Sequence, residues 1–188
     1  MLKYIKEAGK YVEITGFRNV GIKDAEEFVK AARKETPQST WVQFFDAELV
    51  ATWQHLYFAV LNALLAFKTE RNISKSVAME AMLYASAQRQ IRKAIDFMGV
   101  KCASATVAVV IIGENADSVK ALLSAVSKRI GEESDETVLD ILKEKVQGIR
   151  EAFGITETEL ETVMEKNNDK QALVNLVIER MALLSTQL

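Results

Sequence analysis

The sequence has very few of the residues that build most enzyme centres, with one cysteine and one histidine among 188 residues. Cys102 alone excludes a disulfide framework and a cysteine-based zinc site. His55 alone largely excludes multi-histidine metal sites and histidine–cysteine nucleophile pairs. Glycine-rich phosphate loops are also missing, because Gly113 stands alone beside an acidic residue. We therefore expect no catalytic residues, no metal site and no cofactor.

Long hydrophobic runs are missing as well. The longest apolar stretch, residues 56–67, contains Asn62 and is too short to span a bilayer. Residues 1–7 lack the apolar core and the cleavage site of a signal peptide. Hydrophobic residues still make up 49% of the chain and charged residues 27%, which allows a substantial core. We expect a cytoplasmic protein without a membrane partner.

The charge is unevenly distributed, although its net value is only −2. Residues 68–93 carry six basic and two acidic side chains, whereas residues 114–170 carry fourteen acidic and eight basic ones. A polyanion responds to the local field rather than to the total charge. The first segment can therefore attract nucleic acid even though the whole chain is slightly acidic.

Periodicity predicts three strands and seven helices. Strand patterns occur in residues 11–17, 40–45 and 106–113, and the last is an unbroken β-branched run, as in a strand covered on both faces. Helical patterns occur in residues 24–34, 47–69, about 74–98, 117–130, 134–153, 156–166 and 169–184. The helix over 47–69 is apolar nearly all round, which predicts a buried central helix.

These elements predict a mixed α/β fold of the α+β type, with a small three- to four-stranded sheet packed against many helices. A length of 188 residues fits one domain. We expect residues 1–188 to form it, with an α/β core over about 1–130 and a helical C-terminal part over about 131–188 packed on that core.

Two residues of the predicted central helix have alternative interpretations. His55 is either a core histidine with satisfied hydrogen bonds or a general base, and we favour the first because no carboxylate lies three or four residues away. A small-molecule enzyme using His55 and a loop acid near Glu114 is the alternative, which a deep polar pocket would favour. Asn62 is expected to tie a loop to the core through its amide.

Residues 86–98 of the helix predicted over about 74–98 have two different sides at about 100° per residue. One stripe, expected to face the core, consists of Ile91, Ala94, Ile95 and Met98. The opposite side carries Arg89, Arg92 and Lys93, with Ser86 beside them and Gln90 at the margin. Arginine forks and amides suit phosphates and base edges, so this side is a candidate RNA-binding surface. An ordinary solvated face is the alternative.

The same segment resembles a known family. Residues 84–91 are Tyr-Ala-Ser-Ala-Gln-Arg-Gln-Ile, followed by Ala94-Ile95 and Met98-Gly99-Val100-Lys101. They resemble the Ala-Ser-Gly-Gln-Arg-Gln-Ile stretch of a KEOPS-complex subunit family, whose human member is the PRPK-binding protein and which has archaeal relatives. The similarity continues in blocks, in the same order, at residues 45–47, 55–63, 72–76 and 176–184.

The resemblance implies a subunit without an active site. It implies binding to the small kinase/ATPase subunit of KEOPS and, as in archaea, to the 3′ CCA end of tRNA. The catalytic subunit of that assembly installs threonylcarbamoyl on the adenosine beside the anticodon. We expect tRNA contacts from Arg71, Lys75, Ser86, Gln88, Arg89, Gln90, Arg92 and Lys93. A kinase-binding regulatory protein without RNA contact is the alternative.

The last predicted helix carries an apolar stripe of Val174, Val177, Ile178, Met181 and Leu184. This stripe docks either on the kinase or on the core of the chain itself. The resemblance favours Met181 and Leu184 as kinase contacts. We therefore predict kinase binding by Val177, Met181 and Leu184.

Ala87 stands where the family usually has glycine. A positive φ angle, or close approach of RNA, would make a methyl group unfavourable at this position. In an ordinary helical conformation, alanine would instead be neutral or mildly stabilising. We predict the helical conformation.

Overall fold

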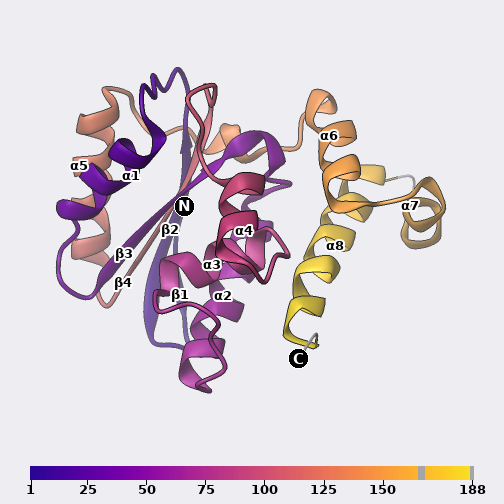
Figure 1. Cartoon of the computed structure of the whole chain (residues 1–188), viewed down its shortest axis with the longest axis horizontal. Coiled ribbons are helices and arrows are strands. Elements are labelled where there is room, and N and C mark those ends of the chain that lie inside the picture. The colour runs from indigo at the N-terminus through magenta and orange to yellow at the C-terminus, as the bar shows by residue number, and fades with distance from the viewer. Residues whose placement is uncertain (165–167, 187–188) are drawn as a thin grey trace.

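The computed structural model describes residues 1–164 and 168–186 of the chain. Within them, eight α-helices accompany one four-stranded antiparallel sheet (Figure 1). The strands are β1 (Leu2–Ile5), β2 (Lys10–Phe17), β3 (Thr40–Asp46) and β4 (Val107–Gly113), and they lie in the order β1-β2-β4-β3. The predicted fold class, a mixed α/β fold with a small sheet and many helices, is confirmed.

Strand β4 is central because both of its edges are paired and both of its faces are covered. All seven of its residues are buried, as expected for an unbroken β-branched run. Strands β2, β3 and β4 match the three predicted strands closely. Strand β1 was not identified in the sequence, because it has only four residues and its pairing with β2 depends on the turn at Gly9, where φ is +63°.

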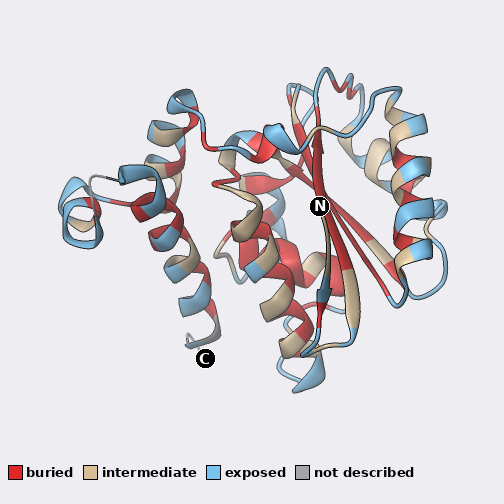
Figure 2. Cartoon of the chain, turned by 180° about the vertical axis from the view of Figure 1, so that it is seen from behind, coloured by how far each residue is buried: buried red, intermediate tan, exposed pale blue. Residues whose placement is uncertain are grey.

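The two faces of the sheet carry separate helical layers. Helices α1 (Ala25–Lys34) and α5 (Ala116–Ile130) cover one face, and α2 (Trp53–Lys68), α3 (Val77–Ala85) and α4 (Ile91–Met98) lie on the other (Figure 1). Side chains alternate along β4, so Val109 packs in the first layer and Val110 in the second. Figure 2 shows most of β2, β3 and β4 buried between these layers and the outer side of α5 exposed.

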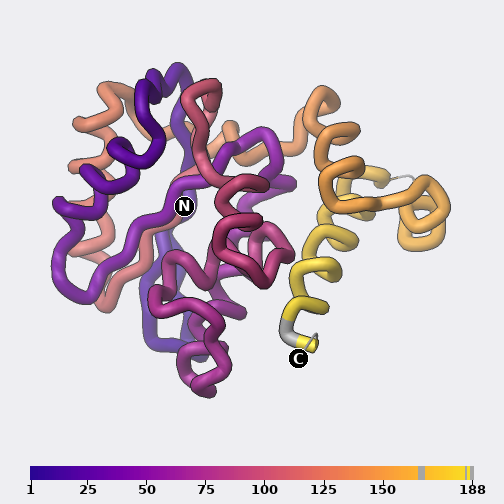
Figure 3. Tube along the Cα trace, in the orientation of Figure 1, coloured from indigo at the N-terminus to yellow at the C-terminus, as the bar shows by residue number. Residues whose placement is uncertain are grey.

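The C-terminal part contains a short 3-10 helix, η2 (Glu136–Leu139), followed by α6 (Lys143–Phe153), α7 (Glu157–Val163) and α8 (Asp169–Ala182). Helix η2 packs on β2, α8 packs on α2, and α7 packs on α8, so α7 and α8 lie on the side away from α1 and α5 (Figure 3). Val177 of α8 belongs to the same buried cluster as Leu56 of α2. Gly16 of β2 allows η2 to approach closely, since an added Cβ would lie 2.5 Å from Cβ of Val138.

The predicted central helix begins later than expected. The chain first forms a 3-10 helix, η1 (Ala47–Leu49), because the Asp46 carboxylate accepts a hydrogen bond from the Glu48 backbone N–H at 3.1 Å. Helix α2 then starts after Thr52, whose hydroxyl caps it by accepting from Gln54 N–H. The helix is buried along most of its length, but Phe58 remains 38% exposed. The prediction that the central helix starts at residue 47 was therefore wrong, because the caps at Asp46 and Thr52 divide the apolar segment into two helices.

Two other predicted helices are divided. The segment 74–98 forms α3 and α4 with a turn between them, and the segment 134–153 forms η2 and α6. Buried Lys145 connects the second pair, since its Nζ donates to the carbonyls of Ala47 (2.9 Å) and Val138 (2.8 Å). The predicted end of the 156–166 helix lies partly outside the described residues.

Candidate functional site

The turn between α3 and α4 carries most of the predicted tRNA-binding residues. Helix α3 ends with the Gln88 N–H donating to the Leu83 carbonyl (3.0 Å) and the Ala87 N–H donating to the Tyr84 carbonyl (2.9 Å). This pair of bonds defines a Schellman motif, in which the residue after the cap takes a left-handed conformation. Ala87 has φ +51° accordingly. The prediction of one continuous helix here, with Ala87 in an ordinary helical conformation, was wrong.

The division changes what faces the core. Ala94 and Met98 are fully buried, as predicted for the apolar stripe of α4. Ile91 and Ile95 are each 43% exposed. The stripe prediction was therefore half wrong, because α4 has only eight residues and touches the core through a single turn.

Replacing Ala87 by glycine is expected to stabilise the fold by about 0.5–1 kcal/mol. A left-handed conformation costs a non-glycine residue roughly 1–2 kcal/mol, and the greater flexibility of unfolded glycine offsets part of the gain. The change is measured as a shift in the urea midpoint of unfolding. Ala121→Gly on the exposed side of α5 is the matched control and should lose about 1 kcal/mol. Equal losses in both variants would contradict the assignment.

His55 holds the end of α3 in place from the neighbouring helix. Its Nδ1 accepts the Ala51 N–H at 3.3 Å, and its Nε2 lies 2.8 Å from the Ala85 carbonyl, to which it donates. The imidazole is fully buried, and it packs edge to face with the Phe153 ring, with 5.6 Å between the two ring centroids. Burial lowers the pKa of His55 to about 4, opposed by the bond to Ala85. These contacts match the core-histidine interpretation.

The geometry of His55 and Glu114 argues against the alternative of a small-molecule enzyme that uses these two residues. His55 has no exposed surface, so no substrate reaches it. The proposed acid partner, Glu114, lies at the end of β4 and pairs with Lys10 at 2.9 Å. The two residues that this hypothesis needed therefore serve separate structural contacts.

Glu80 is a buried carboxylate that the sequence did not single out. It lies on α3 and accepts the backbone N–H groups of Ile73 (3.0 Å) and Ser74 (2.7 Å). These bonds hold the loop between α2 and α3, which carries Arg71 and Lys75. Because the loop is fixed to α3, its basic side chains have a defined position relative to the α3–α4 turn.

A cavity of about 380 Å³ opens where this loop, the turn and the C-terminus meet. It is lined by Asn62, Leu65, Ala66, Thr69, Arg71, Ile73, Tyr84, Arg89, Leu184 and Thr186. Arg71 and Arg89, predicted from the sequence as tRNA contacts, therefore lie at one site. Leu184, predicted as a kinase contact, lines the same site. We call this hollow the arginine cavity.

Asn62 and Tyr84 are two cavity residues with hydrogen-bonding side chains that sequence reasoning did not assign to binding. The Asn62 amide makes no hydrogen bond with any residue in the ranges 1–164 and 168–186, so the expected tie to a loop is not formed. Burial raises the pKa of the Tyr84 hydroxyl, as does the nearby charge of Glu80. Tyr84 thus stays a neutral donor. Both residues lie within the blocks of family resemblance, which was the available signal.

The remaining predicted tRNA contacts occupy different positions. Gln90, Arg92 and Lys93 are exposed at the start of α4, whose first turn contains no acid and whose N-cap residue, Gln90, makes no side-chain cap. Ser86 is buried, with its hydroxyl donating to the Met82 carbonyl at 2.8 Å. Gln88 is half-buried in the turn.

Lys75 lies apart from the arginine cavity. It lines a second hollow of about 720 Å³ together with Lys6, Lys10 and Lys68. Trp41 forms part of the same surface, and Lys10 Nζ lies 5.6 Å from its ring centroid. The structure thus divides the predicted basic residues between two sites around the C-terminal end of α2.

The predicted kinase-contact residues, which lie on α8 and on the short 3-10 helix η3 (Leu183–Thr186) after it, pack inside the chain. Val177, Met181 and Leu184 are buried in the cluster that α8 shares with α2. Docking on the chain's own core, the alternative left open by the sequence, is therefore what these side chains do here. Exposed apolar surface nearby is instead provided by Phe58 on α2 and Leu183 after α8.

Within residues 1–164 and 168–186, no helix has the length and apolar character needed to cross a bilayer. The same residues include no cluster of three histidine, cysteine, aspartate or glutamate side chains placed to hold a metal ion.

Comparison with known proteins places this arrangement in a family. The family model described as kinase binding protein CGI-121 matches residues 17–185, which include the α3–α4 turn and α8. The chain is also 36% identical over 134 residues to the regulatory protein Cgi121 of Methanocaldococcus jannaschii, covering 71% of this chain and 83% of that protein. The resemblance seen in residues 84–91 is thereby confirmed, and the chain belongs to the CGI-121 family.

Proposed function

We propose that this chain is a non-catalytic, cytoplasmic subunit of a KEOPS-type assembly that binds a small kinase/ATPase subunit and the 3′ CCA end of tRNA. The family description supports the kinase partner, because it is that of a kinase binding protein. The arginine cavity carries the RNA part of the proposal. Through its partners, the chain would serve threonylcarbamoyl transfer to tRNA by another subunit.

The chemistry of the arginine cavity suits the end of a single strand. Arg71 and Arg89 offer guanidinium donors to phosphates. Tyr84 and the unpaired amide of Asn62 offer an aromatic surface and hydrogen bonds to an unstacked base. The volume of about 380 Å³ lies within the range of small-ligand sites.

The start of α4 supplies a second source of positive potential next to Arg89. Backbone N–H groups in the first turn of a helix point outward and attract anions. The first turn of α4 adds Arg92 and Lys93, and no acid offsets them there. We propose that the phosphates leading to the CCA end lie along this turn. Buried Ser86 would then shape the turn rather than touch RNA.

The direct test compares intact tRNA with tRNA lacking its terminal CCA, for the wild type and Arg89→Glu, in the presence of defined salt. Wild-type affinity is expected to fall about tenfold or more when CCA is removed, because phosphate and base contacts disappear together. Arg89→Glu should bind intact tRNA about tenfold more weakly, and its salt slope should decrease by about one. Lys120→Glu, on exposed α5 across the sheet, is the matched control.

Equal affinities in all four combinations would contradict the RNA proposal. A chain that still binds the kinase under these conditions would then be the regulatory protein without RNA contact. If the control variant loses as much affinity as Arg89→Glu, binding depends on overall charge rather than on the cavity.

We propose that the kinase docks on the exposed apolar side of α2 next to the 3-10 helix that follows α8, Leu183–Thr186. Phe58 is exposed, and Leu61 and Leu65 on the same side of α2 are half-buried. Leu183 adds an apolar side chain that is 41% exposed. Apolar residues in such a patch are the usual centre of a stable interface. Buried Val177 and Met181 would support this surface from below.

A further inference from the structure

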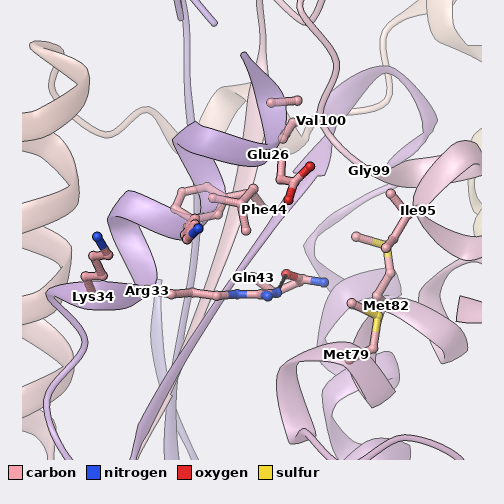
Figure 4. A pocket seen from close by; sticks show the side chains of 13 residues that line it. Glu26, Arg33, Lys34, Gln43, Phe44, Met79, Met82, Ile95, Gly99 and Val100 are labelled. Atoms are coloured by element: carbon pink, nitrogen blue, oxygen red, sulfur yellow. Dashed lines mark hydrogen bonds between the residues drawn. The ribbon is translucent and has the colours of Figure 1, made fainter. Parts of the chain in front are cut away.

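A cavity of about 830 Å³, separate from the arginine cavity, lies between α1 and the pair of helices α3 and α4 (Figure 4). Helix α1 forms one wall, α3 and α4 form the other, and residues of edge strand β3 lie between them. Sites of 300–1,000 Å³ between elements are typical of small-molecule binding. Neither the proposed tRNA contacts nor the proposed kinase surface uses this cavity.

The lining is mostly apolar. Its apolar side chains include Val29, Phe44, Met79, Met82, Ile95 and Val100. Phe44 is held by an edge contact with Phe28, whose ring centroid is 5.1 Å away, so one side of the cavity is rigid. The methionines opposite adapt readily to the shape of a ligand. Ile95 is 43% exposed, so its apolar side chain is in contact with water. A ligand with an apolar body would cover this surface.

Arg33 is the polar feature of the cavity. Its side chain extends from α1 across β3 towards Met82, and its guanidinium donates to Gln43 Oε1 at 3.1 Å (Figure 4). Desolvation by burial lowers its pKa from the ordinary value. In the described ranges, 1–164 and 168–186, no carboxylate forms an ion pair with Arg33, and neighbouring Glu35 pairs with Arg129 instead. Because Arg33 is exposed to solvent at the mouth of the cavity, its guanidinium can be reached by an anion, which would gain a charge-assisted hydrogen bond there.

The other charges leave Arg33 available to an anion. Lys30 lies on the same helix and also lines the cavity. Among the described lining residues Glu26 alone is acidic, and it lies near Val100, away from the Arg33 guanidinium (Figure 4). A guanidinium has five N–H donors in a fork that fits a carboxylate with two bonds. Arg33 uses one of these donors on Gln43.

We propose that this cavity binds a small organic acid, with an aromatic or branched apolar body between Phe44 and the two methionines and a carboxylate on Arg33. Strand addition at β3 fits less well, because Gln43 is only 3% exposed and Arg33 lies across that edge. The apolar walls set the shape of the ligand, and the guanidinium sets its charge.

The test titrates the full chain with 2-naphthoate and 4-methylpentanoate, followed by NMR chemical shifts. Saturable shifts are expected in α1 and α4, and 2-naphthalenemethanol, which has the ring without the charge, should bind about tenfold or more weakly. Arg33→Met should weaken naphthoate binding about tenfold or more, because a charge-assisted bond is lost. Lys120→Met removes an equal charge from exposed α5 and should leave affinity unchanged.

Ile95→Glu provides an independent variant, because Ile95 is partly exposed and its replacement leaves the core intact. A carboxylate at this rim should repel naphthoate and reduce its affinity several-fold. The proposal is overturned if neither acid binds, if the alcohol binds as well as naphthoate, or if Arg33→Met retains full affinity. It is also overturned if the chain is a dimer that Ile95→Glu dissociates, since the cavity would then be an interface between copies.

Discussion

Lowering the pH from 7 to 4 is expected to reduce the free energy of unfolding by roughly 3 kcal/mol through His55 alone. The folded-state pKa of this buried imidazole is about 4, whereas its ordinary value is 6.5. Between these values the unfolded chain binds a proton that the folded chain does not. The contribution of neutral His55 to stability is therefore fully present above pH 6.5 and is lost as the pH falls towards 4. Urea unfolding at several pH values measures the change.

His55→Phe is the variant that isolates this effect. It removes the titrating group and leaves the Ala51 N–H and Ala85 carbonyl without their buried partner, which costs about 1–3 kcal/mol for each group. The variant should be less stable at pH 7, and its stability should change little between pH 6.5 and 4. Hydrogen bonds lower the carboxyl pKa values of Asp135 and Glu159 to about 2, so their contributions to stability are lost only as the pH falls from the ordinary values of 3.8 and 4.5 towards 2. Parallel pH profiles for wild type and variant would refute the assignment.

Phe58→Glu is expected to weaken binding of the small kinase subunit by about 2–4 kcal/mol, or roughly 30- to 1,000-fold. The proposed kinase surface centres on the apolar side of α2, where a carboxylate would be desolvated without a partner. Phe58 is 38% exposed, so the fold should tolerate the substitution. Co-purification and a titration with labelled kinase measure the loss, and thermal unfolding of the free chain checks the fold.

Leu142→Glu is the matched control for this prediction. Leu142 is 45% exposed at the start of α6 and lies outside the proposed surface. Its replacement should leave kinase affinity unchanged. If Leu142→Glu weakens binding and Phe58→Glu does not, the kinase docks elsewhere. Leu184 is unsuitable for this purpose, since it is only 3% exposed and a charge there would damage the core.

Local patterns predicted the regular parts of the fold well. Strand β4 follows from its unbroken β-branched run, and α1 follows from its apolar spacing and from Asp24, which caps it. The predicted boundaries failed where a short-range polar contact ended an apolar pattern. Thr52 starts α2 several residues late, and Asp135 begins η2 where a helix was expected. Such caps compete with helix continuation, and periodicity does not register them.

The candidate site was predicted in part. Arg71 and Arg89 come together because Glu80 and His55 fix the two loops that carry them. Asn62 completes the cavity from α2. The His55 contact joins residues of two different helices, and the Glu80 contact joins a helix to the loop before it, so spacing along one helix could not reveal either.

The sequence by itself determined the family of this protein, its mixed α/β class, the strands of its core and its separation of charge, because these depend on residue type and short-range order. Only the tertiary structure decided that Ala87 takes a left-handed conformation, that Val177 and Met181 face inward, and that Ile91 and Ile95 face water. An apolar stripe indicates that one side of a helix is covered, but it does not indicate which part of the chain, or which partner, covers it. That choice depends on which surfaces the rest of the chain brings within reach.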